Sequence, residues 1–341
     1  KRLHSGRRLT EKERLAGPTP TGRRTSRRLE ALQMMTPTAR LRPVASLLVA
    51  LAFVVCGAPW STGQVALAQE QTLFVSVADA NGEPVTDLGP NELTVVMDGE
   101  DSETLNLEPF NWPVRLTIFV DNGEGGRTSV GQIRDGLQGF LDAIPQEVEV
   151  ALLTTAGRPQ WVVRHTTDRA ELTSGIDLIT PIGGSGATFM DSLVEEAKRL
   201  DDDDEGEYFP VIVMVATDGA DTSGATPRRY EEALRRLVEN SATVHTLMLA
   251  TAGNQGGIAS QVGANVAEVT RGTHESLAVA SAFATMLPEL GQDIARKHKL
   301  VSNQYRLTYK PPDDVSDRPS LSIAISRSGL KMFPTLDGNV P

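Results

Sequence analysis

The sequence has little cysteine and little histidine, two common sources of structural and catalytic sites. Its single cysteine, Cys56, cannot form a disulfide within one chain, so the fold must be stabilised by a buried core. The five histidines include no pair with the spacing of zinc ligands, and we expect them to have structural or surface roles. The sequence therefore favours neither a disulfide scaffold nor a zinc site.

Positive charge is also in deficit. The chain has 33 Lys and Arg against 44 Asp and Glu, a formal net charge of −11. Residues 1–68 hold 12 of the basic and 3 of the acidic side chains, so the rest of the chain carries −20. Such a field repels nucleic acid and anionic membranes, and it favours cations or basic partners. We therefore expect no nucleic-acid partner.

No apolar run reaches the roughly 20 residues of a membrane-spanning helix. The apolar run 44–55 is shorter, follows Arg42 and precedes the small residues Ala66-Leu-Ala68, which is the pattern of a secretory signal peptide. We predict a basic disordered leader or mis-assigned start over 1–33 and a signal peptide over 34–68. After cleavage we expect a secreted or periplasmic protein of the cell envelope without stable membrane insertion. An uncleaved anchor is the alternative.

Both ends of the remaining chain show the alternating apolar pattern of β-strands. Neither end has enough strands to bury a face by itself, so we predict that they pair. The expected product is one small antiparallel β-sandwich made of residues 69–111 and 300–341. Its expected strands are 73–78, 92–97, 305–309 and 321–325.

The centre of the chain, residues 112–299, alternates strand-like and helix-like segments. The expected strands are 114–120, 148–154, 160–165, 208–217 and 243–249, and the expected helices include 128–143, 168–179, 188–200, 227–238 and 276–298. Such alternation yields a mostly parallel sheet with helices on both faces. We predict the α/β class, with a doubly wound, Rossmann-like domain inserted in the β-sandwich.

Two of the expected strands are followed directly by an aspartate, Asp121 in one case and Asp218 in the other. Between them, the glycine-rich segment Gly183-Gly-Ser-Gly-Ala-Thr188 opens a helix. The hydroxyl of Thr188 can then meet both carboxylates at the carboxyl ends of the parallel strands. Oxygen ligands of this kind suit a small divalent cation. The alternative is that the aspartates only cap helices that follow the strands.

The order of these motifs resembles the von Willebrand factor type A family, whose metal-ion-dependent adhesion site reads D-x-S-x-S, then T, then D-G. Here the first motif is Asp121-Asn-Gly-Glu-Gly-Gly126, with Gly123 and Gly125 in place of the serines. Further segments resemble an exported bacterial group of von Willebrand A-related proteins that is common in acidobacteria. These segments are 74–85, 93–99, 217–223 and 304–311, and the likeness covers nearly all of 72–335.

The resemblance implies that Asp121, Thr188 and Asp218 hold Mg²⁺ or Mn²⁺, directly or through water, with Glu124 and Asp221 nearby. In metal-dependent members of the family, a carboxylate of the partner completes the coordination shell. The two glycines of the first motif offer no side-chain oxygen, so this site is a degenerate version of the family's. We expect metal binding to be weak or absent.

The resemblance also implies binding rather than catalysis. We expect an exported binding or adhesion module, not an enzyme, that engages an extracellular or periplasmic protein, or a glycan, at the carboxyl-end rim of the sheet. Two alternatives stay open: an envelope scaffold, and a metal-assisted hydrolase that uses Asp121 and Asp218 as cation ligands. The hydrolase lacks a candidate base or nucleophile at the rim.

Overall fold

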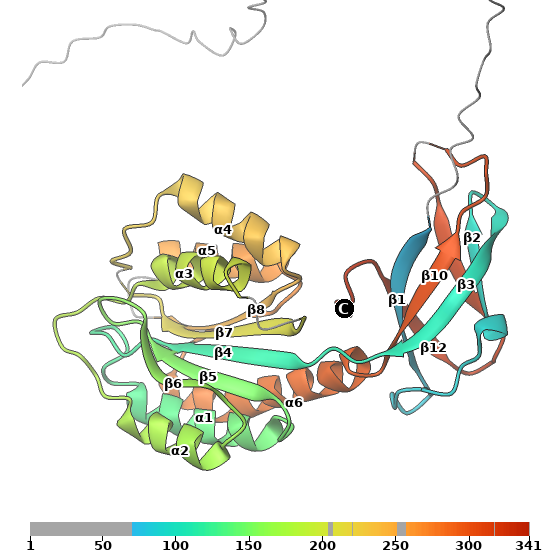
Figure 1. The fold of residues 1–341 in the computed structure, drawn as a ribbon. Coiled ribbons are helices and arrows are strands. Elements are labelled where there is room, and N and C mark those ends of the chain that lie inside the picture. The colour runs from blue at the N-terminus through green and yellow to red at the C-terminus, as the bar shows by residue number, and fades with distance from the viewer. Residues whose placement is uncertain (1–69, 204–206, 220, 251–256, 317, 341) are drawn as a thin grey trace, which may run out of the picture. The chain divides into compact units, whose positions relative to one another are not determined.

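The computed structural model of the chain describes residues 70–340, with gaps at 204–206, 220, 251–256 and 317. The predicted leader and signal peptide lie outside the described residues. Within the described ranges, no helix is long and apolar enough to cross a membrane. The strands of these ranges form two six-stranded sheets (Figure 1).

The first sheet is antiparallel and takes strands from both ends of the chain. In spatial order its strands are β11 (Leu321–Ile325), β2 (Leu93–Met97), β3 (Glu100–Phe110), β10 (Gln304–Lys310), β1 (Gln71–Ala78) and β12 (Lys331–Thr335). β1 pairs with both β10 and β12, so the two chain ends lie side by side as predicted. Asp98 and Gly99, both with positive φ, form the tight turn between β2 and β3.

The predicted sandwich is correct only in part, because the six strands form one continuous hydrogen-bonded order rather than two sheets. β3 makes the connection: its first residues pair with β2, and the rest of the strand pairs with β10. Alternate side chains of β1, β2 and β10 still join one apolar cluster, which includes Val75, Val95 and Leu307. The sequence pattern did not predict β3 or β12.

The second sheet lies in the central part of the chain. Its order is β6 (Gln160–Thr166), β5 (Glu149–Thr154), β4 (Val114–Val120), β7 (Phe209–Thr217), β8 (Thr243–Leu249) and β9 (His274–Leu277). Neighbouring strands are parallel except for the pair of β5 and β6. From β4 the chain first adds strands on one side and then on the other. Ligands of open parallel sheets bind beside such a reversal, at the carboxyl ends of the strands.

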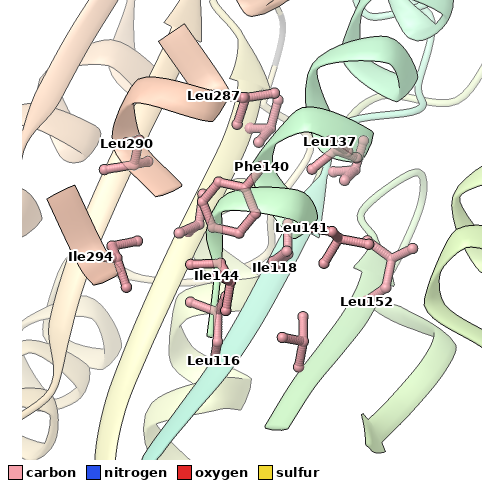
Figure 2. Packing of buried hydrophobic residues seen from close by; sticks show 14 of the residues in the cluster. Leu116, Ile118, Leu137, Phe140, Leu141, Ile144, Leu152, Leu287, Leu290 and Ile294 are labelled. Atoms are coloured by element: carbon pink, nitrogen blue, oxygen red, sulfur yellow. The ribbon is translucent and has the colours of Figure 1, made fainter. Parts of the chain in front are cut away.

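Helices cover both faces of this sheet (Figure 1), which confirms the doubly wound architecture. One face packs against α1 (Val130–Ala143), α2 (Arg169–Leu178) and α6 (Phe283–Val301), and the other against α3 (Phe189–Asp201), α4 (Pro227–Glu239) and α5 (Ile258–Val269). On the first face, Phe140 of α1 and Leu287 of α6 join the cluster around Ile118 (Figure 2). Gly136 permits this close helix packing, because a Cβ there would lie 2.4 Å from the carbonyl oxygen of Phe283.

The predicted helix 276–298 is wrong at its start. Residues 274–277 form β9 beside β8, a 3-10 turn follows at 280–282, and α6 begins only at Phe283. Pairing with the edge of the sheet therefore overrides the local helical pattern. α5 was not among the predicted helices, and it supplies Val266 to the core of the second face.

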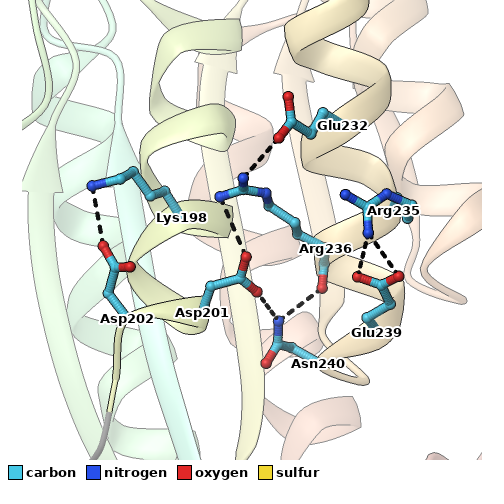
Figure 3. A network of polar contacts seen from close by, with 8 residues as sticks. All are labelled: Lys198, Asp201, Asp202, Glu232, Arg235, Arg236, Glu239 and Asn240. Carbon is cyan, nitrogen blue, oxygen red and sulfur yellow. Dashed lines mark hydrogen bonds and ion pairs between the residues drawn. The ribbon is translucent and has the colours of Figure 1, made fainter.

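Charged side chains connect α3 with α4 on their exposed side (Figure 3). Arg236 of α4 lies 3.3 Å from the carboxylate of Asp201 in α3, and 2.7 Å from Glu232 in its own helix. The amide of Asn240 also donates to Asp201, at 2.8 Å. Exposed pairs each contribute about 0–1 kcal/mol, so this network orients the helices more than it stabilises them.

Candidate functional site

The two aspartates predicted to form a site lie at the same edge of the central sheet. Asp121 follows β4 and Asp218 follows β7, and these strands are parallel neighbours. The backbone N–H of Asp121 donates to the carbonyl of Val215, and that of Asp218 donates to the carbonyl of Leu249, each at 2.8 Å. Both carboxylate residues are only 1% exposed. Their predicted convergence at the carboxyl ends of the strands is therefore what the fold produces.

Thr188 reaches the same edge from the start of α3. Its backbone N–H and its hydroxyl both donate to the carbonyl oxygen of Thr155, at 3.0 and 2.9 Å. The N–H of Thr155 in turn donates to the carbonyl of Val120, the last residue of β4. Thr188 is 3% exposed, and its hydroxyl proton is engaged by a main-chain acceptor. The glycine-rich segment thus delivers Thr188 to the site, as predicted.

Protein donors surround the carboxylate of Asp121. The N–H of Gly123 donates to its Oδ1 at 2.8 Å, and Thr217 donates to its Oδ2 through both the N–H and the hydroxyl. Thr217 is the last residue of β7 and is buried. These three hydrogen bonds occupy three of the roughly four lone-pair sites of the carboxylate, which leaves about one for a cation or a further donor.

Packing crowds Gly123 and Gly125, the positions at which the motif of the von Willebrand A family has serines. A Cβ at Gly123 would lie 2.7 Å from the carbonyl oxygen of Ser185, and a Cβ at Gly125 would lie 2.5 Å from the hydroxyl oxygen of Thr217. Neither glycine has a positive φ, so the backbone conformation itself would accept a serine. The glycine-rich segment and Thr217 therefore occupy the space that serine side chains would need.

Glu124 connects the two loops of the site rather than pointing at the buried carboxylates. Its Oε2 accepts from the N–H of Gly184 at 2.9 Å, and its own N–H donates to the carbonyl of Ser185 at 2.8 Å. The side chain is 56% exposed and lies 3.7 Å from Arg127. Glu124, which the resemblance places near the metal site, is thus an exposed carboxylate on the rim.

Asn122 is a site residue that the sequence reasoning missed. It is 3% exposed, its amide donates to the carbonyl of Thr180 at 2.9 Å, and its Oδ1 accepts from the N–H of Ala156 at 3.2 Å. It thereby fixes the loop after β4 against the loop after β5 and the segment before the glycines. A polar side chain directly after a buried strand and an aspartate is the signal that could have identified it.

Asp221 caps α3. Its Oδ1 accepts from the N–H of Phe189 at 3.2 Å, and also from the N–H and the hydroxyl of Ser223 at 2.9 and 2.6 Å. Oδ2 accepts from the N–H of Met190 at 3.4 Å. Asp221 thus has a helix-capping role, which the sequence suggested as an alternative for Asp121 and Asp218 but not for this residue. This carboxylate satisfies orphan N–H groups of the first helical turn.

The donor set fits a tightly held divalent cation poorly. Two carboxylates and one threonine hydroxyl are present, but a Cβ at Gly123 would crowd the carbonyl oxygen of Ser185 and a Cβ at Gly125 would crowd the hydroxyl of Thr217. Mg²⁺ requires near-octahedral oxygen coordination, which these residues do not provide by themselves. Across the described ranges, no group of three or more His, Cys, Asp or Glu side chains could hold a metal ion.

A second polar feature of the central fold is a cavity of about 440 Å³ between β6 and α3. None of the predicted site residues lines it. Its wall includes Glu196, whose pKa is raised by burial and whose carboxylate pairs with Arg199. It also includes His165, whose pKa burial lowers to about 4, and whose Nε2 lies 3.1 Å from the hydroxyl of Thr117. The sequence pattern did not predict that these residues lie together, because they come from three separate elements, β4, β6 and α3.

No protein-family model and no curated protein matches the sequence of this chain. The structure is similar to a von Willebrand factor type A protein from Catenulispora acidiphila, with 11% identity, a TM-score of 0.46, and coverage of 77% of this chain and 72% of that one. It is also similar to the conserved hypothetical protein BatB from Bacteroides thetaiotaomicron, with 13% identity, a TM-score of 0.42, and coverage of 54% and 99%.

A third similar structure is the proximal thread matrix protein 1 of the mussel byssus, solved with a zinc-occupied MIDAS motif. It has 16% identity and a TM-score of 0.42, with coverage of 63% of this chain and 50% of that chain. At such identities the likeness concerns the fold alone. The doubly wound α/β arrangement is observed in this chain itself, and the zinc-occupied motif is a property of the mussel protein.

Proposed function

We propose that this chain is an exported binding module that engages a protein or glycan partner at the carboxyl-end rim of the central sheet, with weak or no dependence on a divalent cation. One observation carries the proposal: Asp121, the first carboxylate of the motif, already accepts hydrogen bonds from Gly123 and Thr217. The filled positions beside both glycines support it as well. The architecture is then retained for recognition, while its metal chemistry is reduced.

The partner is proposed to present a basic side chain. The chain carries a net charge of −11, and complementary charge speeds and orients association. Asp121 and Asp218 are too deeply buried to receive that side chain, whereas Glu124 is 56% exposed at the rim. Its contact with Arg127 is 3.7 Å long and solvent-exposed, so a partner can displace it at little cost.

Export is part of the same proposal. Residues 34–68 would act as a secretory signal peptide, and residues 69–341 would be the protein released to the periplasm or the exterior. The apolar run 44–55 between basic residues and a small-residue cleavage motif supports it. N-terminal sequencing of the protein recovered from the envelope fraction tests the cleavage point after Ala68. A mature protein that still begins before residue 44 would contradict it.

Calorimetric titration of residues 69–341 with Mg²⁺, Mn²⁺ and Ca²⁺ tests the metal side of the proposal. We expect binding in the millimolar range or none, and little change in Asp121→Ala. Micromolar affinity that disappears in Asp121→Ala would overturn the proposal of a metal-poor site. It would instead assign the ion to the three residues of the family motif.

Capture of envelope proteins on the immobilised chain tests the partner side. We expect capture to persist in EDTA, to fall with added salt, and to weaken in Glu124→Gln. Glu231→Gln is the matched control, since Glu231 is an exposed glutamate that belongs to α4 and not to the loops that contain Asp121 and Gly184. Equal loss in both variants would contradict a role for Glu124, and complete loss in EDTA would show that a cation is required.

A further inference from the structure

The two sheets together have four edge strands, and three of them carry features that block pairing with another strand. β6 has register shifts along its pairing with β5 and carries Arg164. β9 is only four residues long and contains Glu275. β12 contains Lys331 and Pro334. Charge, proline, bulges and short length are the usual means by which sheet edges avoid association.

The fourth edge strand, β11, is also short, with five residues, but it has no charge, proline or bulge. Its sequence is Leu321-Ser-Ile-Ala-Ile325, which is uncharged, free of proline and regular in its pairing with β2. Among the described residues it pairs with β2 alone. An apolar edge strand without such protection is a ready template for a further strand.

The backbone groups that face outward from β11 follow from its register. At the two ends of the strand, the carbonyl of Ser320 accepts from the N–H of Asp98, and the N–H of Ser326 donates to the carbonyl of Glu92, both at 2.9 Å. Antiparallel pairs alternate, so even-numbered residues face β2 and odd-numbered residues direct their N–H and C=O groups away from it. The outward groups belong to Leu321, Ile323 and Ile325.

The side chains of the same three residues lie on the face that carries the apolar cluster. Ile323 and Ile325 pack against this cluster, while Leu321 remains 39% exposed. Beside them is a groove of about 310 Å³, whose lining includes Leu73 of β1 and Leu336, which is 74% exposed. The free edge therefore adjoins uncovered apolar surface.

We propose that β11 pairs in antiparallel fashion with β11 of a second copy of this chain, about a two-fold axis at Ile323. Leu321 then lies opposite Ile325 of the second copy, and Ile323 lies opposite its own equivalent. Each outward N–H and C=O group gains a partner, and the aliphatic side chains of both strands meet on one face beside the groove. The antiparallel sheet of one copy and the antiparallel sheet of the other copy then form one continuous sheet.

The strand sequence suits a second copy in particular. Large aliphatic residues occupy both ends and the centre of β11, and small residues, Ser322 and Ala324, lie between them, so the pattern is the same in both directions. The same register places Arg327 opposite Pro319 of the second copy and Arg318 opposite Ser328. No charges of like sign face each other, as they would if an arginine met its own equivalent.

A pair of charge variants tests this register. Ser322 and Ala324 are exposed, and each lies opposite the other in the second copy, in pairs that are not hydrogen-bonded and whose side chains are close. Ser322→Lys with Ala324→Lys brings lysines into opposition across the axis. Ser322→Lys with Ala324→Glu adds the same first lysine but places it opposite a glutamate.

Sedimentation equilibrium of the full chain and both double variants measures the association, and circular dichroism shows that the variants are folded. We expect concentration-dependent dimers of the wild type, association weaker by about tenfold in the double lysine variant, and wild-type or stronger association in the lysine–glutamate variant. A wild type that stays monomeric at all concentrations overturns the proposal, and so does equal association of the two variants.

Hydrogen exchange of the wild type provides a measurement that needs no substitution. The amides of residues 321, 323 and 325 should become protected as the protein concentration rises, while those of Arg164 and Glu275 on other edges should not change. Protection of these three amides that does not depend on concentration would overturn self-pairing. It would indicate that β11 is closed by another segment of its own chain.

Discussion

Restoring one of the missing serines should destabilise the protein, even though the family motif carries serine there. In Gly125→Ser, the new Cβ would lie 2.5 Å from the hydroxyl oxygen of Thr217. The backbone φ of this residue is not positive, so the cost comes from crowding alone. Gly125 itself is exposed, but Thr217 is 3% exposed, and crowding of a buried side chain typically costs about 1–3 kcal/mol. The displaced Thr217 hydroxyl would also lose its hydrogen bond to Asp121.

Removing the threonine hydroxyl tests the same contact from the other side. Thr217→Ala leaves Oδ2 of Asp121 with the backbone N–H of residue 217 as its remaining donor among those described. A hydrogen bond to a charged group contributes about 1.5–3 kcal/mol. In the double variant, the serine enters the space that Thr217 vacates, so the two costs should overlap by about 1 kcal/mol or more.

Urea unfolding is measured for the wild type, the two single variants and the double variant by the fluorescence of Trp112 and Trp161, and it completes this double-mutant cycle. Gly131→Ser is the matched control, because no atom lies within 4 Å of a Cβ at Gly131. It should leave stability unchanged or raise it slightly, since serine is the better helix former. Additive costs of the two single variants, or a Gly125→Ser protein as stable as the control, would refute the assignment of this space to Thr217.

Three further predictions concern the fold around the site. Asp221→Ala should lower the unfolding free energy by about 1–2 kcal/mol in urea titrations, with or without Mg²⁺, because a helix cap is lost; a loss confined to Mg²⁺-containing buffer would contradict the capping role. Gly136→Ala should lower the free energy of unfolding by about 1–3 kcal/mol because the new Cβ clashes with Phe283. Gly131→Ala should be neutral or stabilising. Thermal unfolding in which Gly136→Ala is the more stable of the two variants would contradict the packing. Burial lowers the pKa of His245 from 6.5 to about 3, so its contribution to stability is complete above pH 6.5 and is lost as the pH falls from there toward 3. From pH 7 to pH 5, the free energy of unfolding should decline less in His245→Gln than in the wild type, by up to about 1.4 kcal/mol per pH unit. Equal declines in the two proteins would contradict this role of His245.

The parts of the fold that the sequence predicted well are those with a strong local pattern. β7 is an almost continuous apolar run, β4 and β8 are rich in large apolar residues, and the observed bounds of all three agree closely with the expected ones. The helices α1 to α4 begin within two residues of their predicted starts. Burial on both faces of a parallel sheet requires apolar residues along the strand, so the local sequence is sufficient to predict such a strand.

The missed elements depend on tertiary contacts. β3 reads Glu-Asp-Ser-Glu-Thr-Leu-Asn-Leu-Glu-Pro-Phe, which is polar on most positions, and it is a strand because β2 and β10 pair with it on either side. β9 is fixed by pairing with β8, against a helical pattern in the same segment. Local propensity is a weak predictor where a neighbouring strand supplies the hydrogen bonds.

In the candidate site, too, some features could be predicted from the local sequence and others depend on tertiary contacts. The spacing of Asp121, Thr188 and Asp218 was sufficient to predict that the fold brings them to one rim. The sequence could not reveal that Thr217 donates to Asp121, or that Ser185 fills the space beside Gly123, because these contacts join segments about 60 to 100 residues apart. Glycine at both motif positions predicted that these positions supply no side-chain oxygen, but only the packing shows which atoms lie beside them.

The pairing of β3 with β10 has a mechanical consequence. Phe110 and Gln304, between which the whole central fold is inserted, face each other as neighbours in this ladder. A pull on the two termini of the described chain is therefore borne by the antiparallel sheet, in which β1 and β12 are themselves paired. Tension applied through the termini would therefore not reach the rim of the central sheet at first. It would act on that rim, and on a partner proposed to bind there, only after strands of the antiparallel sheet had separated.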